Sequence, residues 1–149
     1  MDNAQFFMMM KEARKLSGKS ILDVCIAMHK SQSTVINMMC GKLNYQLSKI
    51  FEFLHAIDCE IVVNDNHTVV IELTSSHETM QWVKTLYEGM NSYQLADILH
   101  CAQGTALNMF KRGDMKLSIF LTVINTHHWT VNLQPVDIAN IASTSDCDF

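Results

Sequence analysis

A ten-residue block occurs twice in this chain, and this repetition constrains the fold more than any other feature of the sequence. The first copy begins at His29 and the second at His100, 71 residues further along. Three polar residues recur at the same positions, as Gln32, Thr34 and Asn37 in the first copy and Gln103, Thr105 and Asn108 in the second. The apolar residues between them differ, so we expect two copies of one structural unit whose polar residues share a task.

The composition indicates a soluble, mainly helical chain. Of its 149 residues 48% are hydrophobic, only five are Gly and one is Pro, and the formal net charge is -4. This length suits one ordinary domain or two very small ones with modest cores. The sequence has no basic leader with a cleavage site, and no apolar run approaches the roughly 18 residues of a membrane span. We therefore expect a cytoplasmic protein that makes no membrane contact.

Helical periodicity with recognisable start and stop signals covers the first half of the chain. The first predicted helix begins near Ala4, and its apolar stripe extends to Leu16 before Ser17-Gly18 ends it. Ser20 is predicted to cap a short second helix, and Ser31 a third helix that Gly41 ends. A fourth helix is predicted over residues 47–57. The period then changes to that of a β-hairpin, with strands at 59–63 and 68–73 around a polar turn.

The second half repeats this order. We predict helices at about 78–88, 92–99, 102–112 and 117–125, followed by a strand at 129–133. The offset between equivalent residues changes from 71 to 70 near Gly41 and Gly113, in a loop where a one-residue deletion is tolerated. The expected fold is mainly α, with two tandem units at residues 1–73 and 74–149 and a short strand or hairpin after each. One such strand is unstable alone, so the two units are expected to share a small sheet.

Two short helices joined by a tight turn have the layout of a helix-turn-helix. Val24-Cys25, the opening Ser31-Gln32-Ser33-Thr34, the core residue Val35 and the terminal Gly41 follow this pattern, and the chain resembles the lambda-repressor-like (Cro or XRE type) DNA-binding family. In the second copy Leu95-Ala96 matches the same pattern. The resemblance covers about residues 4–63 and, more weakly, 78–133. It implies that the third helix of each unit is a recognition helix for the DNA major groove.

The resemblance implies a set of DNA-binding residues in the first unit: Lys19, Lys30, Ser31, Gln32, Ser33, Thr34, Ile36, Asn37 and Lys42. Gln and Asn amides pair with adenine N6 and N7, at roughly 1 to 3 kcal/mol of discrimination per good pair. Ser and Thr hydroxyls bond bases or phosphates, Ile36 meets a thymine methyl group, and the lysines hold phosphates. The alternative is that these polar residues form only a solvated face.

A second set of DNA-binding residues follows from the second copy: Gln103, Thr105, Asn108, Lys111 and Arg112. This copy has Ala102 where the first has its Ser31 cap. Its charge also differs. Residues 1–50 carry seven basic and three acidic side chains, a local charge of +4, whereas residues 74–149 carry four basic and seven acidic ones. The second unit is therefore the weaker candidate for reading DNA.

A chain with an overall charge of -4 gains little affinity for DNA from long-range electrostatic attraction, so we expect it to need two DNA-binding units. In one arrangement the two halves form a pseudo-dimer that places two recognition helices about 34 Å apart. In the other, the second half mediates homodimerisation through its strand and its apolar residues Trp82, Leu107 and Trp129. The acidic balance of the second half and its missing cap favour the homodimer.

Other chemistry has little support in the sequence. The five cysteines are widely spaced and form no Cys-x-x-Cys pair, which argues against a disulfide framework or a zinc module. Adjacent His127 and His128 point to different sides of a strand, and neighbours such as His100 and Cys101 do not face each other on a helix. We expect no catalytic residue, no metal and no cofactor.

The main interpretation is therefore a sequence-specific DNA-binding transcriptional regulator, of repressor or antitoxin type, with double-stranded DNA as its partner. The alternative is a protein-interaction module on a helix-turn-helix scaffold that does not read DNA. Four apolar residues on the predicted recognition helices favour the alternative: Ile36, Met39, Leu107 and Phe110.

Overall fold

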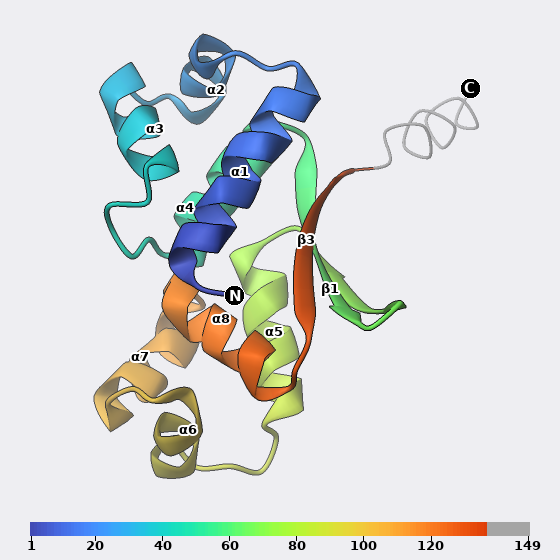
Figure 1. Cartoon of the computed structure of the whole chain (residues 1–149). Helices are drawn as coiled ribbons and strands as arrows, with labels where there is room; N and C mark the ends of the chain where they lie inside the picture. The colour runs from blue at the N-terminus through green and yellow to red at the C-terminus, as the bar shows by residue number, and fades with distance from the viewer. Residues whose placement is uncertain (137–149) are drawn as a thin grey trace, which may run out of the picture.

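The computed structural model describes residues 1–136, which form eight helices and a small three-stranded sheet (Figure 1). The first half contains α1 (Asn3–Ser17), α2 (Ile21–Met28), α3 (Gln32–Met39), α4 (Leu47–Ala56), β1 (Cys59–Asp65) and β2 (Thr68–Leu73). The second half contains α5 (Ser76–Leu86), α6 (Ser92–Leu99), α7 (Gln103–Arg112), α8 (Leu117–Thr126) and β3 (Thr130–Pro135). The mainly helical class is confirmed. Residues 137–149 of the predicted second unit lie outside the described residues.

Local capping explains where several helices begin. Asp2 and Gln5 form a capping box on α1, and Ser20 and Asp23 form one on α2, where the Ser20 amide donates to Asp23 Oδ2 at 2.8 Å. Each box satisfies amide groups that have no partner inside the helix. The predicted fifth helix begins earlier than expected, at Ser76, because Ser75 Oγ accepts the amide hydrogen of Glu78 at 3.1 Å.

The central strand joins the two halves of the chain. The sheet order is β2-β1-β3, and β1 pairs antiparallel with both neighbours. Val62 pairs with Asn132, its equivalent at an offset of 70 residues, while Ile61 pairs with Leu133 and Val63 with Val131. Antiparallel pairing centred on two equivalent residues relates β1 and β3 by a local twofold axis. The expectation that the two units share a small sheet is confirmed.

A second twofold contact connects the segments that lead into α4 and α8. Gln46 and its equivalent Lys116 form an isolated antiparallel β-bridge. The Leu47 amide donates to the Met115 carbonyl at 2.8 Å, and the Leu117 amide donates to the Tyr45 carbonyl at 2.9 Å. Each of these two hydrogen bonds joins the residues equivalent, at the same offset of 70, to those joined by the other. The two halves are therefore paired symmetrically at both α4/α8 and β1/β3.

Each half also caps a helix of the other half. Neither Gln46 nor Lys116, the N-cap residues of α4 and α8, makes a side-chain capping hydrogen bond. Instead, the Ser48 amide donates to Asp114 Oδ1 at 3.1 Å, and the Ser118 amide donates to Asn44 Oδ1 at 3.2 Å. A carboxylate or amide oxygen at a helix N-terminus accepts a hydrogen bond from a free amide and interacts favourably with the positive end of the helix dipole. These reciprocal caps join the ends of α4 and α8 to the partner half.

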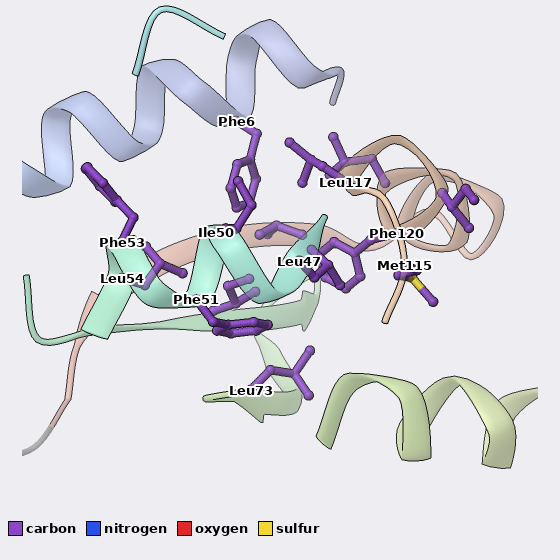
Figure 2. Close-up of a cluster of buried hydrophobic side chains, with 14 of the residues drawn as sticks. Phe6, Leu47, Ile50, Phe51, Phe53, Leu54, Leu73, Met115, Leu117 and Phe120 are labelled. Atoms are coloured by element: carbon purple, nitrogen blue, oxygen red, sulfur yellow. The ribbon is translucent and has the colours of Figure 1, made fainter. Parts of the chain in front are cut away.

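One hydrophobic core runs through both halves. Figure 2 shows Phe6 of α1, Ile50 of α4 and Phe120 of α8 meeting above Leu73 of β2, and all four are fully buried. Leu16 departs from the predicted buried stripe of α1, because the last turn of that helix reaches the surface and leaves Leu16 82% exposed. Phe6, Phe7, Met10 and Ala13 form the buried face of α1.

Of the groups predicted to form a homodimer interface, the strand β3 and the two tryptophans make contacts within the chain, whereas Leu107 is 42% exposed. The strand β3 pairs with β1, and the ring of Trp129 stacks on that of Trp82 with centroids 5.6 Å apart. The other face of this cluster is occupied by His127, whose ring centroid lies 4.2 Å from that of Trp129. His127 follows α8 and is not part of a strand, contrary to expectation. The strand β3 thus joins the two halves, whereas the two tryptophans stack within the second half.

Within residues 1–136, no helix is both long enough and apolar enough to cross a membrane.

Candidate nucleic-acid interface

The helix α3 presents a polar face at its opening. Ser31 is the N-cap, and its Oγ accepts the Thr34 amide at 3.3 Å and lies 2.8 Å from Thr34 Oγ1. Val35, Met38 and Met39 anchor the helix in the core. The remaining faces are solvent exposed at Gln32, Ser33, Ile36 and Asn37. The predicted contact residues of α3 thus lie together on one accessible surface.

The turn that positions α3 contains a histidine in a conformation that favours glycine. His29 has φ 55°, in the left-handed region, and its equivalent His100 has φ 53° in the turn before α7. In both turns the next amide closes back on the preceding helix, from Lys30 to the Cys25 carbonyl and from Cys101 to the Ala96 carbonyl, each at 3.1 Å. The two helix pairs α2–α3 and α6–α7 therefore share one connection geometry. Figure 1 shows both pairs on the side of the molecule away from the β1–β2 hairpin.

The helix α7 opens differently from α3. Its N-cap residue Ala102 makes no side-chain capping bond, as its sequence predicted. Gln103 is half-buried and donates from Nε2 to Ser92 Oγ of α6 at 2.8 Å. The next residue, Gly104, has no side chain, whereas Thr105 and Asn108 are exposed like their counterparts on α3. The repeated Gln therefore has two different environments in the two halves.

The basic residues are also distributed unequally. Lys30 and Lys42 are exposed before and after α3, and Lys111 and Arg112 are exposed in the last turn of α7. Lys19 lies in the loop between α1 and α2, where its Nζ is 3.9 Å from Asp58 Oδ2. This ion pair offsets the charge of Lys19 and connects it to the start of β1, so Lys19 is the weakest member of the predicted set.

Between α3 and α7 lies a concave surface, here termed the central groove. It consists of two hollows of about 420 and 240 Å³ that share Gln46 and Lys116, the two residues of the β-bridge. Equivalent residues occur on both walls, with Thr34 on one side and Thr105 on the other. Its charged lining residues are Lys30, Lys49, Arg112, Lys116, Glu52 and Asp114, which give a local charge of +2 in a chain of charge -4.

Sequence reasoning did not find Lys49 as a lining residue of this groove. Lys49 lies near the β-bridge that Gln46 and Lys116 form, and its Nζ is 3.4 Å from Glu52 Oε1. The signal that could have found Lys49 is the alignment of Leu47 with Leu117, which places Lys49 and Lys116 at the start of equivalent helices. Only the pairing between the halves brings these residues into one surface.

The exposed surface of this region also carries apolar side chains. Ile36 is 38% exposed and Leu107 is 42% exposed, and they occupy equivalent positions on α3 and α7. Met39 is buried and Phe110 is half-buried, so these two do not extend the apolar surface as expected. On α2, Leu22 and Ile26 are each 65% exposed.

The described residues contain no group of three or more His, Cys, Asp or Glu side chains that could hold a metal ion. Cys101, beside His100, is half-buried, and burial raises the pKa of its thiol, with a smaller opposing effect from the Ala106 amide. A raised pKa disfavours the thiolate that acts as a nucleophile.

Comparisons of the chain with protein-family models, with curated proteins and with solved structures found no match. The lambda-repressor-like resemblance therefore stays a prediction from the sequence.

Proposed function

We propose that this chain is a sequence-specific regulator that binds double-stranded DNA as a pseudo-dimer, with α3 and α7 as its two recognition helices. The observation that carries the proposal is the twofold pairing of the halves. It gives one chain two similar helix pairs on the same side, which flank a basic groove in an otherwise acidic protein. Twofold-related helices that enter successive major grooves are the general solution of helix-turn-helix dimers.

The exposed amides supply the chemistry of base recognition. Gln32 and Asn37 are exposed on α3. Either amide can pair with adenine N6 and N7, and the exposed Ile36 can contact a thymine methyl group. Base contacts of this kind carry the specificity, while contacts to the phosphates fix the orientation of the protein.

The cations around α3, α7 and the central groove supply the phosphate contacts. Each phosphate neutralised by Lys or Arg releases counterions, so affinity falls as salt rises. Replacing both Lys111 and Arg112 by Gln is expected to lower the log–log salt slope by about 2, one for each lost contact. A binding constant that barely changes with salt would contradict a phosphate footprint.

The second candidate function is a protein-interaction module on the same scaffold. The observation that favours it is the exposure of Leu22 and Ile26 on α2 and of Ile36 on α3, because apolar residues on adjacent helices suit a protein partner. The two functions make opposite predictions for DNA selection.

The deciding experiment is selection of duplexes from a random pool. The wild-type chain is expected to enrich an adenine-containing, nearly palindromic site with half-sites about 10 base pairs apart. The variant Gln32→Ala/Asn37→Ala should lose this enrichment. The matched control Gln81→Ala/Asn132→Ala removes the same side chains from exposed positions on α5 and β3 and should retain it. No enrichment by the wild type would support the interaction module.

Native mass spectrometry of the complex tests the pseudo-dimer. One 17.0 kDa chain for each selected duplex is the expected result. Two chains on a duplex that contains a single pair of half-sites would support an intermolecular dimer instead.

A further inference from the structure

We infer that the two halves read DNA unequally, so that one chain binds its site in one fixed orientation, with a specific half-site at α3 and a degenerate half-site at α7. This inference rests on the proposed function and names the class of duplex that the chain recognises. It follows from three differences between two halves with equivalent backbones: the environment of the repeated Gln, the residue after it, and the charge of the last helical turn.

The first step is that α3 and α7 belong to one body. The register of β1 with β3, the bridge between Gln46 and Lys116, and the caps from Asp114 and Asn44 all connect the two halves. A chain that places α3 on one half-site must therefore present α7 to the adjacent one. It cannot place two copies of α3 on the same duplex site without a second chain.

The second step compares the base-reading groups of the two helices. At the first contact position Gln32 is exposed, whereas Gln103 donates to Ser92 at 2.8 Å and is half-buried. At the second position Ser33 is exposed, whereas Gly104 offers no side chain. The asparagines Asn37 and Asn108 are exposed in both halves. The helix α3 thus presents two free amides and α7 only one.

The third step compares the charges. The last turn of α3 contains no basic residue, whereas the last turn of α7 contains Lys111 and Arg112, and Lys116 follows. These cations contact phosphates without regard to base sequence. The helix with fewer base-reading groups has two cations in its own last turn, whereas Lys30 and Lys42 lie before and after α3. The second half therefore contributes mainly phosphate contacts, which hold the protein on the DNA without selecting the base sequence.

The consequence is an operator with unequal halves. Each bidentate amide contact changes affinity about 5- to 150-fold when its base pair is exchanged, which corresponds to roughly 1 to 3 kcal/mol. Two positions in the α3 half-site are expected to show this sensitivity, and one in the α7 half-site. The same substitution made in the two halves of one duplex should thus have different effects.

The first test uses the wild-type chain and base-pair substitutions in the selected duplex. Each position of the left half-site and its symmetry mate in the right half-site are exchanged separately, and affinity is measured at one salt concentration. Unequal losses between mates support the inference. Equal losses at all mates would overturn it while leaving the proposed function intact, whereas failure of the wild type to bind any duplex would remove the proposed function itself.

The second test locates α3 on the DNA directly. Cys40 is exposed at the C-cap of α3, and Cys25 and Cys59 are buried, so a thiol-linked iron chelate attaches at Cys40 once Cys101 and Cys147 are replaced by Ser. Cleavage of the selected duplex at one end only is expected, at the half-site most sensitive to substitution. Equal cleavage at both ends would show that the chain binds in either orientation and would overturn the inference.

The third test attempts to convert α7 toward α3. Gly104→Ser restores the missing hydroxyl, and an added Cβ at this position meets no atom within 4 Å. Ser92→Ala removes the partner of Gln103 and frees its amide. The double variant is expected to raise the sensitivity of the degenerate half-site to base substitution at least fivefold, with the other half-site unchanged. An unchanged half-site in a variant with the wild-type circular dichroism spectrum would contradict the inference.

Discussion

Gly41, which follows the C-cap residue of α3, combines two constraints that can be separated by experiment. It has φ +67°, and a Cβ on it would lie 2.8 Å from Cδ2 and 3.1 Å from Cγ of Phe7. Phe7 cannot easily move away, because it is buried and packs edge-on against Phe6 and Tyr45. Gly41→Ala therefore introduces both backbone strain and a steric clash between α1 and the end of α3.

The matched control is Gly113, which ends α7 with φ +69° and has no atom within 4 Å of an added Cβ. An alanine in the left-handed region costs about 1 to 2 kcal/mol at either position. Overpacking against Phe7 adds about 1 to 3 kcal/mol at Gly41 alone. We expect Gly113→Ala to lower the free energy of unfolding by about 1 to 2 kcal/mol and Gly41→Ala by about 2 to 5 kcal/mol.

Urea unfolding followed by circular dichroism measures both losses, provided that the denaturant slope m is the same for all variants. Phe7→Leu in the Gly41→Ala background should recover part of the additional loss, because the shorter side chain leaves room for the new Cβ. Equal destabilisation by Gly41→Ala and Gly113→Ala would refute the steric reasoning. It would mean that α1 and α3 do not approach each other at this point as described.

Three further predictions concern the caps. Asp114→Ala removes the acceptor for an amide at the start of α4, and thermal unfolding should show a loss of about 0.5 to 2 kcal/mol; an unchanged midpoint would contradict the reciprocal capping. Ser31→Ala should cost a similar amount, whereas Ala102→Ser should add up to about 1 kcal/mol, and a gain from the first or a loss from the second would count against these N-cap assignments. Hydrogen bonds from the Ser20 backbone amide and hydroxyl hold the pKa of Asp23 below its usual range, so the stability they provide is present above about pH 4 and is lost as the pH falls through the lowered pKa. Asp23→Asn should therefore reduce the acid-induced loss of stability measured by unfolding below pH 4. The same dependence of stability on pH in the variant and the wild type would contradict this role.

The sequence by itself determined the local structure of this protein. Ser20, Ser31 and Gly41 marked helix ends, the change from helical to alternating periodicity marked the strands, and the duplicated block marked the repeat. These signals act between residues a few positions apart, so their physical effect is contained in a short stretch of chain. The polar face of α3 was predictable for the same reason, since its exposed and buried residues follow the helical period.

Only the tertiary structure decided how the two copies meet. The pairing of Val62 with Asn132 and the cap from Asp114 on α4 join the two halves, and the stacking of Trp82 on Trp129 joins residues far apart within the second half. Helical and strand periods show which face of an element is buried, but not which partner covers it. For this reason the sequence did not show that β3 pairs with β1 of the same chain or that Trp82 stacks on Trp129, and the basic central groove exists only because the two halves are paired.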